Sequence, residues 1–393
     1  MRSLVEQTLN VGGRKHMQEM KRRDTFRPEP ILFTIPNFIT AGSGRAMLNI
    51  IERLDKERFA PVVCVARKGG ELDAEVVRMG IPFIEAPFTV PARPYHKLLF
   101  RAARAAQVFK PYRFSLWHSF HYSDDYSEPI IARLAGTRNW IYTKKNMSWG
   151  SRAWRLRSRL ARRIVAQNSV MFERFFPKQQ HKVRLIPCGV ILNPSAANGS
   201  SVELRRKWGF SSDATIVGHV AHFVPVKNHP HLLRALAQTK KNVVLVFAGE
   251  FQDSVYVSEV RTLAKELCVE NRVLFLGKVR DVPSFLEALD AFAFCSHKES
   301  CPVAVLEAMA HRLPSVVTDI PAITEIHKRD QTALVVPKDD FGAFAAALDR
   351  LAVDGQRRRE LGDAARRRVE ENFGIEQEVS EYQRLYLDLL SEG

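Results

Sequence analysis

The sequence predicts an α/β protein made of two doubly wound domains, each with a parallel sheet. Of its 393 residues, 46% are apolar, which is enough for a large core. The chain is also longer than a single domain usually is, so two domains are expected. Short apolar runs alternate with helical stretches, a pattern typical of parallel strands covered by helices on both faces. No apolar run approaches the roughly 18 residues that a membrane-spanning helix needs.

The first domain is expected at residues 30–190. Its expected strands are 31–34, 60–66, 81–84, 114–117, 140–142, 164–166 and 183–186, and its expected helices are 45–54, 72–79, 98–108, 128–134 and 170–175. Residues 1–29 are polar and basic and lack the apolar segment of a secretory signal, so a flexible extension is expected there.

The second domain is expected at residues 213–372, after a linker at 191–212 that is rich in small and polar residues. Its expected strands are 214–220, 243–248, 273–277, 291–295, 315–318 and 333–336, and its expected helices are 302–310, 340–353 and 356–371. A last helix, at 375–390, makes up most of the remaining segment 373–393.

A glycine-rich stretch follows the first expected strand. Gly42, Ser43 and Gly44 lie between that strand and the helix expected at 45–54. Such a turn lets backbone amides approach a ligand closely, although a tight turn needs glycines for its own sake too.

Polar side chains also stand where two strands of the first domain are expected to end. His118 follows the strand at 114–117, and Lys144 follows the strand at 140–142. Ligands of open parallel sheets bind beyond the carboxyl ends of the strands, so both residues are site candidates. The alternative for His118 is a polar residue satisfied inside the protein. Asp124 and Asp125 fit the first turn of the next helix better than a metal site.

The positive charge is concentrated in the first half of the chain. The net charge is +16; residues 1–195 carry 34 Lys and Arg against 15 Asp and Glu, and residues 196–393 carry 25 against 28. An anionic substrate, an anionic membrane face or nucleic acid would each suit this half, and a solvated basic surface is the alternative.

Arginine is densest at residues 151–163, which hold six arginines, no acid, and Trp154, Leu156 and Leu160. This composition suits contact with anionic lipid head groups, with a solvated basic helix as the alternative. No nucleic-acid-binding motif accompanies it, so nucleic acid is the least favoured partner.

The five cysteines show no paired spacing, which argues against a zinc site and a disulfide framework. A reducing, cytoplasmic setting fits best.

Two glutamates frame the stretch that carries the strongest chemical signal. Glu299 belongs to the loop after the strand at 291–295, and Glu307 lies in the following helix, with Ser300, Cys301 and Pro302 at its start. Glu307 falls on or beside the apolar stripe of that helix, where a carboxylate is costly unless donors meet it. A hydroxyl-rich ligand would supply donors, and the helix start suits a phosphate. A basic neighbour for Glu307 and a plain loop role for Glu299 are the alternatives.

This segment resembles the donor-site signature of the family 4 glycosyltransferases, which are retaining enzymes of the GT-B fold. The match is Glu, seven residues and Glu, ending in Glu-Ala-Met-Ala at residues 307–310 and followed by Pro-Ser-Val-Val-Thr-Asp at 314–319. The resemblance implies that Glu299 lies against the donor sugar and that Glu307 holds the ribose hydroxyls. It also implies that His118 faces the reaction centre, that Gly42 and Gly44 face the cleft between the domains, and that the last helix crosses back onto the first domain.

The loop after the first strand of the second domain is the other strong match. The family has an arginine there and a lysine five residues later, and both hold the donor diphosphate. Lys227 matches the lysine, whereas His222 replaces the arginine. Two cations there would stabilise the charge of the departing diphosphate, but a histidine does so only when protonated or through one N–H. The glycine turn at Gly249 and the segment around Val279, where the family contacts the base, complete the expected donor site.

The expected function is transfer of a sugar from a UDP- or GDP-type donor to a glycan or lipid-linked acceptor, in polysaccharide or lipopolysaccharide synthesis. The resemblance implies no metal or other cofactor. The expected location is cytoplasmic, with contact to the inner membrane face. A GT-B nucleotide-sugar isomerase and a non-catalytic nucleotide-sugar or lipid-binding protein are the alternatives.

Overall fold

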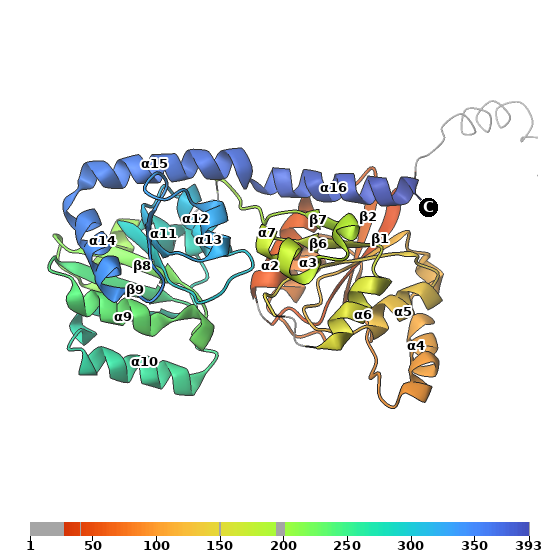
Figure 1. Cartoon of the computed structure of the whole chain (residues 1–393). Helices are drawn as coiled ribbons and strands as arrows, with labels where there is room; N and C mark the ends of the chain where they lie inside the picture. The colour runs from red at the N-terminus through yellow and green to blue at the C-terminus, as the bar shows by residue number, and fades with distance from the viewer. Residues whose placement is uncertain (1–26, 40, 149–150, 194–200, 393) are drawn as a thin grey trace, which may run out of the picture.

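The computed structural model describes residues 27–39, 41–148, 151–193 and 201–392. It forms two α/β domains side by side (Figure 1). The predicted extension at 1–29 lies almost wholly outside the described residues, as does the centre of the predicted linker.

The first domain contains a seven-stranded parallel sheet of order β3-β2-β1-β4-β5-β6-β7. Its strands are β1 (Glu29–Ile35), β2 (Phe59–Val65), β3 (Phe83–Glu85), β4 (Leu116–Ser119), β5 (Asn139–Thr143), β6 (Arg163–Ala166) and β7 (Val183–Leu185). Its helices are α2 (Ala41–Arg53), α3 (Asp73–Arg78), α4 (Leu98–Ala106), α5 (Ser127–Leu134), α6 (Arg152–Leu160) and α7 (Ser169–Phe175). The sheet is apolar on both faces because helices cover both.

The second domain contains a six-stranded parallel sheet of order β10-β9-β8-β11-β12-β13. Its strands are β8 (Thr215–Val220), β9 (Val243–Ala248), β10 (Val273–Gly277), β11 (Ala291–Phe294), β12 (Ser315–Thr318) and β13 (Leu334–Val336). Its helices are α8 (Ser201–Trp208), α9 (His229–Gln238), α10 (Ser254–Glu266), α11 (Val282–Glu287), α12 (Val303–Ala310), α13 (Pro321–Ile326), α14 (Phe341–Val353) and α15 (Gly355–Asn372). The prediction of two doubly wound parallel-sheet domains is therefore confirmed.

The region predicted as a linker differs from that prediction in its described second part. Residues 201–208 form α8, whose Trp208 packs edge-on against Phe285 of α11 with ring centroids 5.8 Å apart. The helix therefore belongs to the second domain. The polar sequence of α8 did not predict a helix, because only a small apolar face is needed to pack it against α11.

The last helix, α16 (Ile375–Ser391), packs against the first domain, whereas α15 before it packs on the second. Figure 1 shows the two helices as a nearly continuous bridge across the top of both domains. Tyr382, Leu385 and Tyr386 of α16 are buried in the same core as β1 and β4. The chain therefore returns to its first domain and ties the two together.

Candidate functional site

Two loops at the carboxyl ends of neighbouring strands form the centre of the candidate site. The first, residues 221–228 after β8, is called the donor loop, and the second, residues 295–302 after β11, is called the signature loop. The amide of His297 donates to the carbonyl of Val226 at 2.9 Å, and the thiol of Cys295 lies 3.2 Å from the carbonyl oxygen of Asn228. These contacts hold the two loops side by side.

Lys227 and Glu299 are in direct contact across these loops. The Lys227 ammonium lies 2.6 Å from a Glu299 carboxylate oxygen, and both side chains are largely shielded, with 21% and 9% of their surface exposed. The two loops that the sequence singled out separately therefore meet at one point. A ligand phosphate at this point would compete with Glu299 for the lysine, and a sugar hydroxyl could donate to Glu299.

Glu307 lies in α12, immediately after the signature loop. Its carboxylate makes no hydrogen bond or ion pair within the part of the chain that the structure describes, although its surroundings raise its pKa to about 7 by removing water. The basic partner that sequence considerations left open is absent among those residues. A carboxylate in this position is suited to accept hydrogen bonds from a ligand that carries hydroxyl groups.

His222 sits in the donor loop beside Glu250, with Nδ1 3.8 Å from the carboxylate. Burial lowers the pKa of His222, and Lys227 and Lys278 act in the same direction while Glu250 opposes them. The imidazole is therefore neutral near pH 7, and Lys227 supplies the formal positive charge of the loop.

His222→Arg is expected to strengthen binding of a nucleoside diphosphate about tenfold at pH 7.5. The arginine carries a permanent charge and two donors that match a diphosphate, whereas the neutral histidine offers one N–H. Isothermal titration of the two proteins with UDP and GDP measures the change. As a control, His181→Arg adds the same charge outside the site and should leave the affinity unchanged; equal affinities for wild type and His222→Arg would contradict a diphosphate at this position.

Gly249 directly follows β9 and has a structural reason to be glycine. A Cβ at this position would lie 1.7 Å from the carbonyl oxygen of Ala221, at the start of the donor loop. Val279 is partly buried against the second-domain core, next to Lys278, which forms a 2.5 Å ion pair with Glu71 of the first domain. Gly249 thus shapes the donor loop, and Val279 lies near a contact between the domains.

Ser300 and Cys301 of the signature loop contact the first domain. Ser300 donates to the carbonyl of Lys145 at 3.0 Å, and its own carbonyl accepts from Asn168 at 2.6 Å. Pro302 is buried and stands at the cap position of α12, so the helix begins at Val303, one residue later than predicted. Cys301 hydrogen bonds to Cys188, and this contact lowers the pKa of Cys188 to about 7.

Sequence considerations missed Asn168 and Ser169, which contact the second domain from the first: Asn168 donates to the Ser300 carbonyl of the signature loop, and Ser169 contacts α13. Asn168 caps α7, and Ser169 donates from its hydroxyl to Glu325 of α13 at 2.6 Å. The sequence shows an Asn-Ser cap before a helix, which is a local signal, but not that the cap faces a second domain.

His118 is not exposed at the site, which corrects the expectation that it faces the reaction centre. It is fully buried, with Nδ1 2.7 Å from the Tyr386 hydroxyl and Nε2 2.8 Å from the Thr143 hydroxyl. Side chains alternate along β4, and His118 points to the face that α16 covers. The alternative of a satisfied interior histidine is the one that the structure favours.

Lys144 directly follows β5, and its ammonium contacts the loop after that strand. Its side chain is buried, its ammonium donates to Asn146 at 3.1 Å, and it lies 4.1 Å from the ring centre of Trp154 in α6. Burial lowers the pKa of Lys144 to about 7. Its role on the acceptor side stays a prediction.

Gly42, Ser43 and Gly44 form the first turn of α2 rather than a loop before it. A Cβ at Gly44 would come within 2.7 Å of the Phe38 ring, whereas Gly42 has open space around it. Figure 1 shows α2 on the side of the first domain that faces the second. The amides of this helix start therefore stay candidates for contact with a ligand.

The arginine-rich segment at 151–163 is less exposed than predicted. Arg157 is fully buried in α6, where its guanidinium forms a 3.1 Å ion pair with the buried Glu128. Trp154 is only 3% exposed. Two of the residues that suggested a membrane face are therefore part of the interior.

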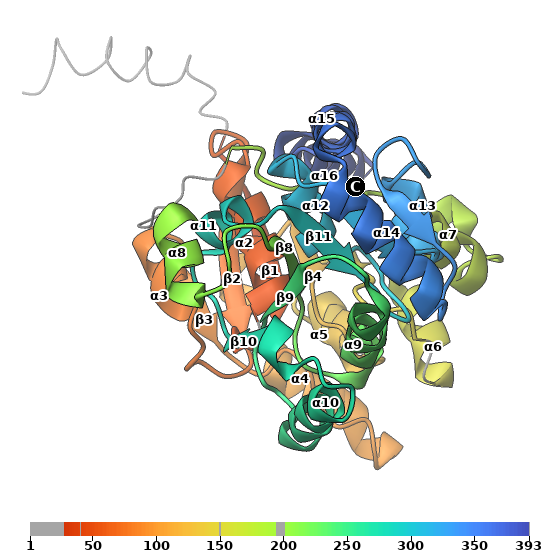
Figure 2. The same ribbon diagram turned by 90° about the vertical axis from the view of Figure 1, so that its left-hand side faces the viewer.

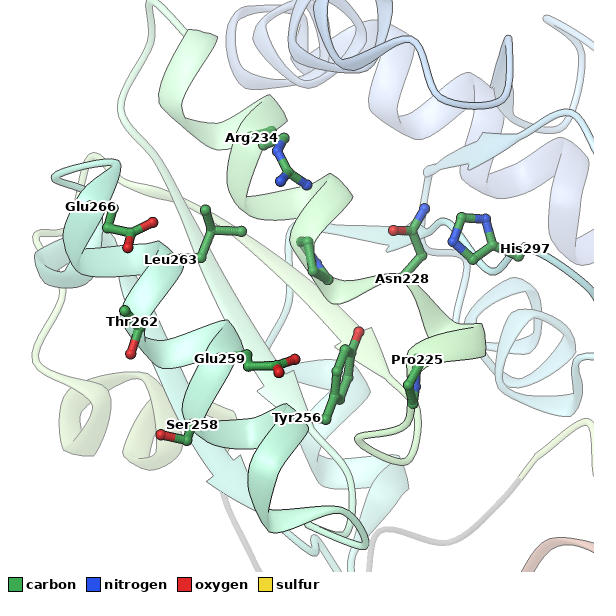
Figure 3. Close-up of a pocket in the computed structure, with 11 residues that line it drawn as sticks. Pro225, Asn228, Arg234, Tyr256, Ser258, Glu259, Thr262, Leu263, Glu266 and His297 are labelled. Carbon is green, nitrogen blue, oxygen red and sulfur yellow. The ribbon is translucent and has the colours of Figure 1, made fainter.

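Two pockets lie beside the paired loops. One, of about 590 Å³, lies between α9 and α10 (Figure 3) and is lined in part by Pro225, Arg234, Tyr256 and Glu259. Neither Lys227 nor Glu299 lines it, so it is separate from the candidate donor contacts. The other, of about 350 Å³, is lined by Ser300 and Cys301 together with residues of both domains.

Among the described residues, no group of three or more His, Cys, Asp or Glu side chains is placed to hold a metal ion. Within the same part of the chain, no helix is long and apolar enough to cross a bilayer.

Comparison with known families gives two matches that follow the domain division. A family model described as "Glycosyltransferase Family 4" matches residues 40–193, and one described as "Glycosyl transferases group 1" matches residues 200–368. Together they account for most of both sheets.

Curated proteins that are similar in sequence to this chain are named as glycosyltransferases or as enzymes that act on sugars. The chain is 32% identical over 190 residues to N-acetyl-alpha-D-glucosaminyl L-malate synthase of Bacillus anthracis, 48% of this chain and 49% of the relative. It is 31% identical over 254 residues to putative glycosyltransferase EpsF of Bacillus subtilis, 59% and 64% of the two chains. It is 25% identical over 217 residues to UDP-Gal:alpha-D-GlcNAc-diphosphoundecaprenol alpha-1,3-galactosyltransferase of Escherichia coli, 53% and 55%. The chain thus spans about half to two thirds of the length of these relatives.

Solved structures share the fold over nearly the whole chain. A glycosyltransferase from Rickettsia africae aligns with a TM-score of 0.82 at 17% identity, covering 94% of this chain and 100% of the other. Anabaena HepE in complex with UDP and glucose aligns with a TM-score of 0.79 at 19% identity, covering 92% and 100%. Both likenesses indicate a GT-B arrangement of the two domains.

Proposed function

The chain belongs to family 4 of the glycosyltransferases, and we propose that it transfers a sugar from a nucleoside diphosphate sugar to a glycan or lipid-linked acceptor. The contact between Lys227 and Glu299 is the observation that carries the proposal, because it joins a cation for a diphosphate to a carboxylate for a sugar. The unpartnered Glu307 of α12, the helix that follows the signature loop, fits ribose hydroxyls, and the described residues offer it no other donor. UDP and GDP are the proposed nucleotides, with no metal or other cofactor required.

The proposed mechanism retains the configuration at the anomeric carbon. The bond from this carbon to the diphosphate oxygen breaks, and Lys227 together with the N–H of His222 stabilises the charge that the oxygen gains. The acceptor hydroxyl attacks from the same face, its proton passes to the departing phosphate oxygen, and Glu299 holds the sugar during the exchange. Ser300, Cys301, Pro302, Gly249 and Val279 shape the donor side, and the first turn of α2 faces the acceptor.

The acceptor class is proposed from the relatives and from the charge of the first half. One relative is named for a diphosphoundecaprenol acceptor, and the basic first domain suits an anionic acceptor of this kind. Synthesis of polysaccharide or lipopolysaccharide on the inner face of a membrane is the setting that combines both features.

The test is turnover of a panel of UDP- and GDP-sugars with and without a diphosphate-lipid acceptor, followed by mass spectrometry. Release of one nucleotide that depends on the acceptor, with a product heavier by one sugar, is the expected result. Conversion of a nucleotide sugar without an acceptor would instead indicate an isomerase, and binding without any release would indicate a non-catalytic protein.

A further inference from the structure

Helix α4 and the segment before it, residues 91–97, carry exposed apolar side chains on the first domain. Tyr95 is 63% exposed, Leu99 65% and Phe100 73%, and they lie within six positions of one another. Leu98 of the same helix is buried, and Ala102 and Ala105 belong to the core to which α5 also contributes. The three exposed residues therefore do not contribute to the core. Large apolar side chains gathered on a surface indicate a site of interaction.

Only positive charge surrounds them in sequence. No acidic residue occurs between Glu85 and Asp124, while this stretch holds six basic residues, Arg93, Lys97, Arg101, Arg104, Lys110 and Arg113. All of them except Arg101 are exposed. An apolar centre with cations around it is complementary to a surface that is apolar inside and anionic outside.

The surface is held in shape by Arg101. Its guanidinium donates to the carbonyl of Pro91 at 3.0 Å and to that of Arg93 at 2.7 Å, which ties the segment 91–97 to α4. The apolar side chains are therefore presented by an ordered structure, and binding costs little ordering entropy.

The position of this surface leaves it accessible. α15 and α16 bridge the domains along the top of Figure 1, whereas α4 projects at the bottom of both views (Figures 1 and 2). No other described element packs over Leu99 or Phe100, because both stay more than half exposed.

We propose that Tyr95, Leu99 and Phe100, with the cations around them, form a docking surface for an anionic phospholipid bilayer. This α4 surface rests on the proposed function in one respect: it would bring the first domain to a membrane that holds a lipid-linked acceptor. The alternative place, α6, offers only Leu156 as an exposed large apolar residue, at 39%, and its Arg157 is buried.

Co-sedimentation of the full chain with vesicles tests the proposal. Vesicles of phosphatidylcholine with about one third phosphatidylglycerol should bind the wild type, and pure phosphatidylcholine should bind it at least tenfold less, since each cation near an anionic surface adds about fivefold. The double variant Leu99→Ser/Phe100→Ser should lose at least tenfold in binding to the anionic vesicles.

Two matched variants separate this surface from general effects. Val255→Ser/Val353→Ser removes apolar side chains of similar exposure, 67% and 64%, from the second domain and should bind like wild type. Arg155→Ser/Arg159→Ser removes two exposed cations from α6 and should cost less than Lys97→Ser/Arg104→Ser does.

Thermal shift by UDP and GDP, measured on every variant, reports the donor site independently. Loss of vesicle binding with an intact nucleotide response would support the α4 surface whether or not an acceptor is found. Three results would each overturn the proposal: unchanged binding by Leu99→Ser/Phe100→Ser, a larger loss of binding from the α6 pair, or no binding of wild type to anionic vesicles. The last of these would indicate that the surface binds a protein partner instead.

Discussion

Lys227→Ala is expected to lower kcat/KM by roughly 100- to 1000-fold, the largest loss of any single change considered. The removed ammonium is the formal cation of the donor loop, because burial keeps His222 neutral near pH 7. Preorganised charge at a departing group is usually worth this much. Steady-state kinetics with the donor and acceptor identified by the panel measures the effect, and the nucleotide-induced thermal shift should shrink in parallel.

A neighbouring lysine provides the control for this change. Lys298→Ala removes an exposed cation next to Glu299 and should alter kcat/KM less than threefold. Lys227→Ala also leaves Glu299 without its partner, so circular dichroism must show that the variant is folded. A folded Lys227→Ala protein with nearly wild-type kcat/KM would contradict the proposal that the donor loop binds the diphosphate.

Glu307→Gln is expected to weaken nucleotide binding about 30- to 100-fold, because the carboxylate would accept hydrogen bonds from two ribose hydroxyls and an amide replaces one acceptor with a donor. Titration with UDP and with its 2′-deoxy analogue measures the effect. The analogue should bind the wild type less tightly and should bind Glu307→Gln with little further loss. Glu287→Gln, at an exposed carboxylate of α11, is the matched control.

The same substitution is expected to change the pH dependence of stability in the absence of ligand. The folded pKa of Glu307 is raised from 4.5 to about 7, so the folded state holds the proton more tightly than the unfolded state does. The resulting stabilisation is complete below pH 4.5 and is lost as pH rises through 7. Glu307→Gln should thus match wild type near pH 4 and exceed its free energy of unfolding by about 2 kcal/mol at pH 8, a value reduced for the part of the side chain that solvent reaches. Urea denaturation at both pH values measures it, and a constant difference between the proteins would contradict a desolvated Glu307.

The sequence by itself determined the fold class and the positions of the two key loops. Apolar runs such as 243–248 predict buried strands because parallel strands covered on both faces need continuous apolar side chains. The spacing from Glu299 to Glu307 is local, so one loop and one helix suffice to define it. These features depend on neighbours in the chain, which a sequence shows directly.

The tertiary structure alone decided which side chains meet. Lys227 and Glu299 are 72 residues apart, and only the adjacent placement of β8 and β11 brings them to 2.6 Å. The sequence predicts His118 just after a strand; it lies inside β4, and α16, whose Tyr386 is 268 residues later, covers the face to which it points. Arg157 likewise lies in the interior, where it forms an ion pair with Glu128, and is not part of a basic surface. The direction of a side chain and the element that covers it arise from packing between distant segments, and for that reason the sequence located the donor loops but not the interior roles of His118, Lys144 and Arg157.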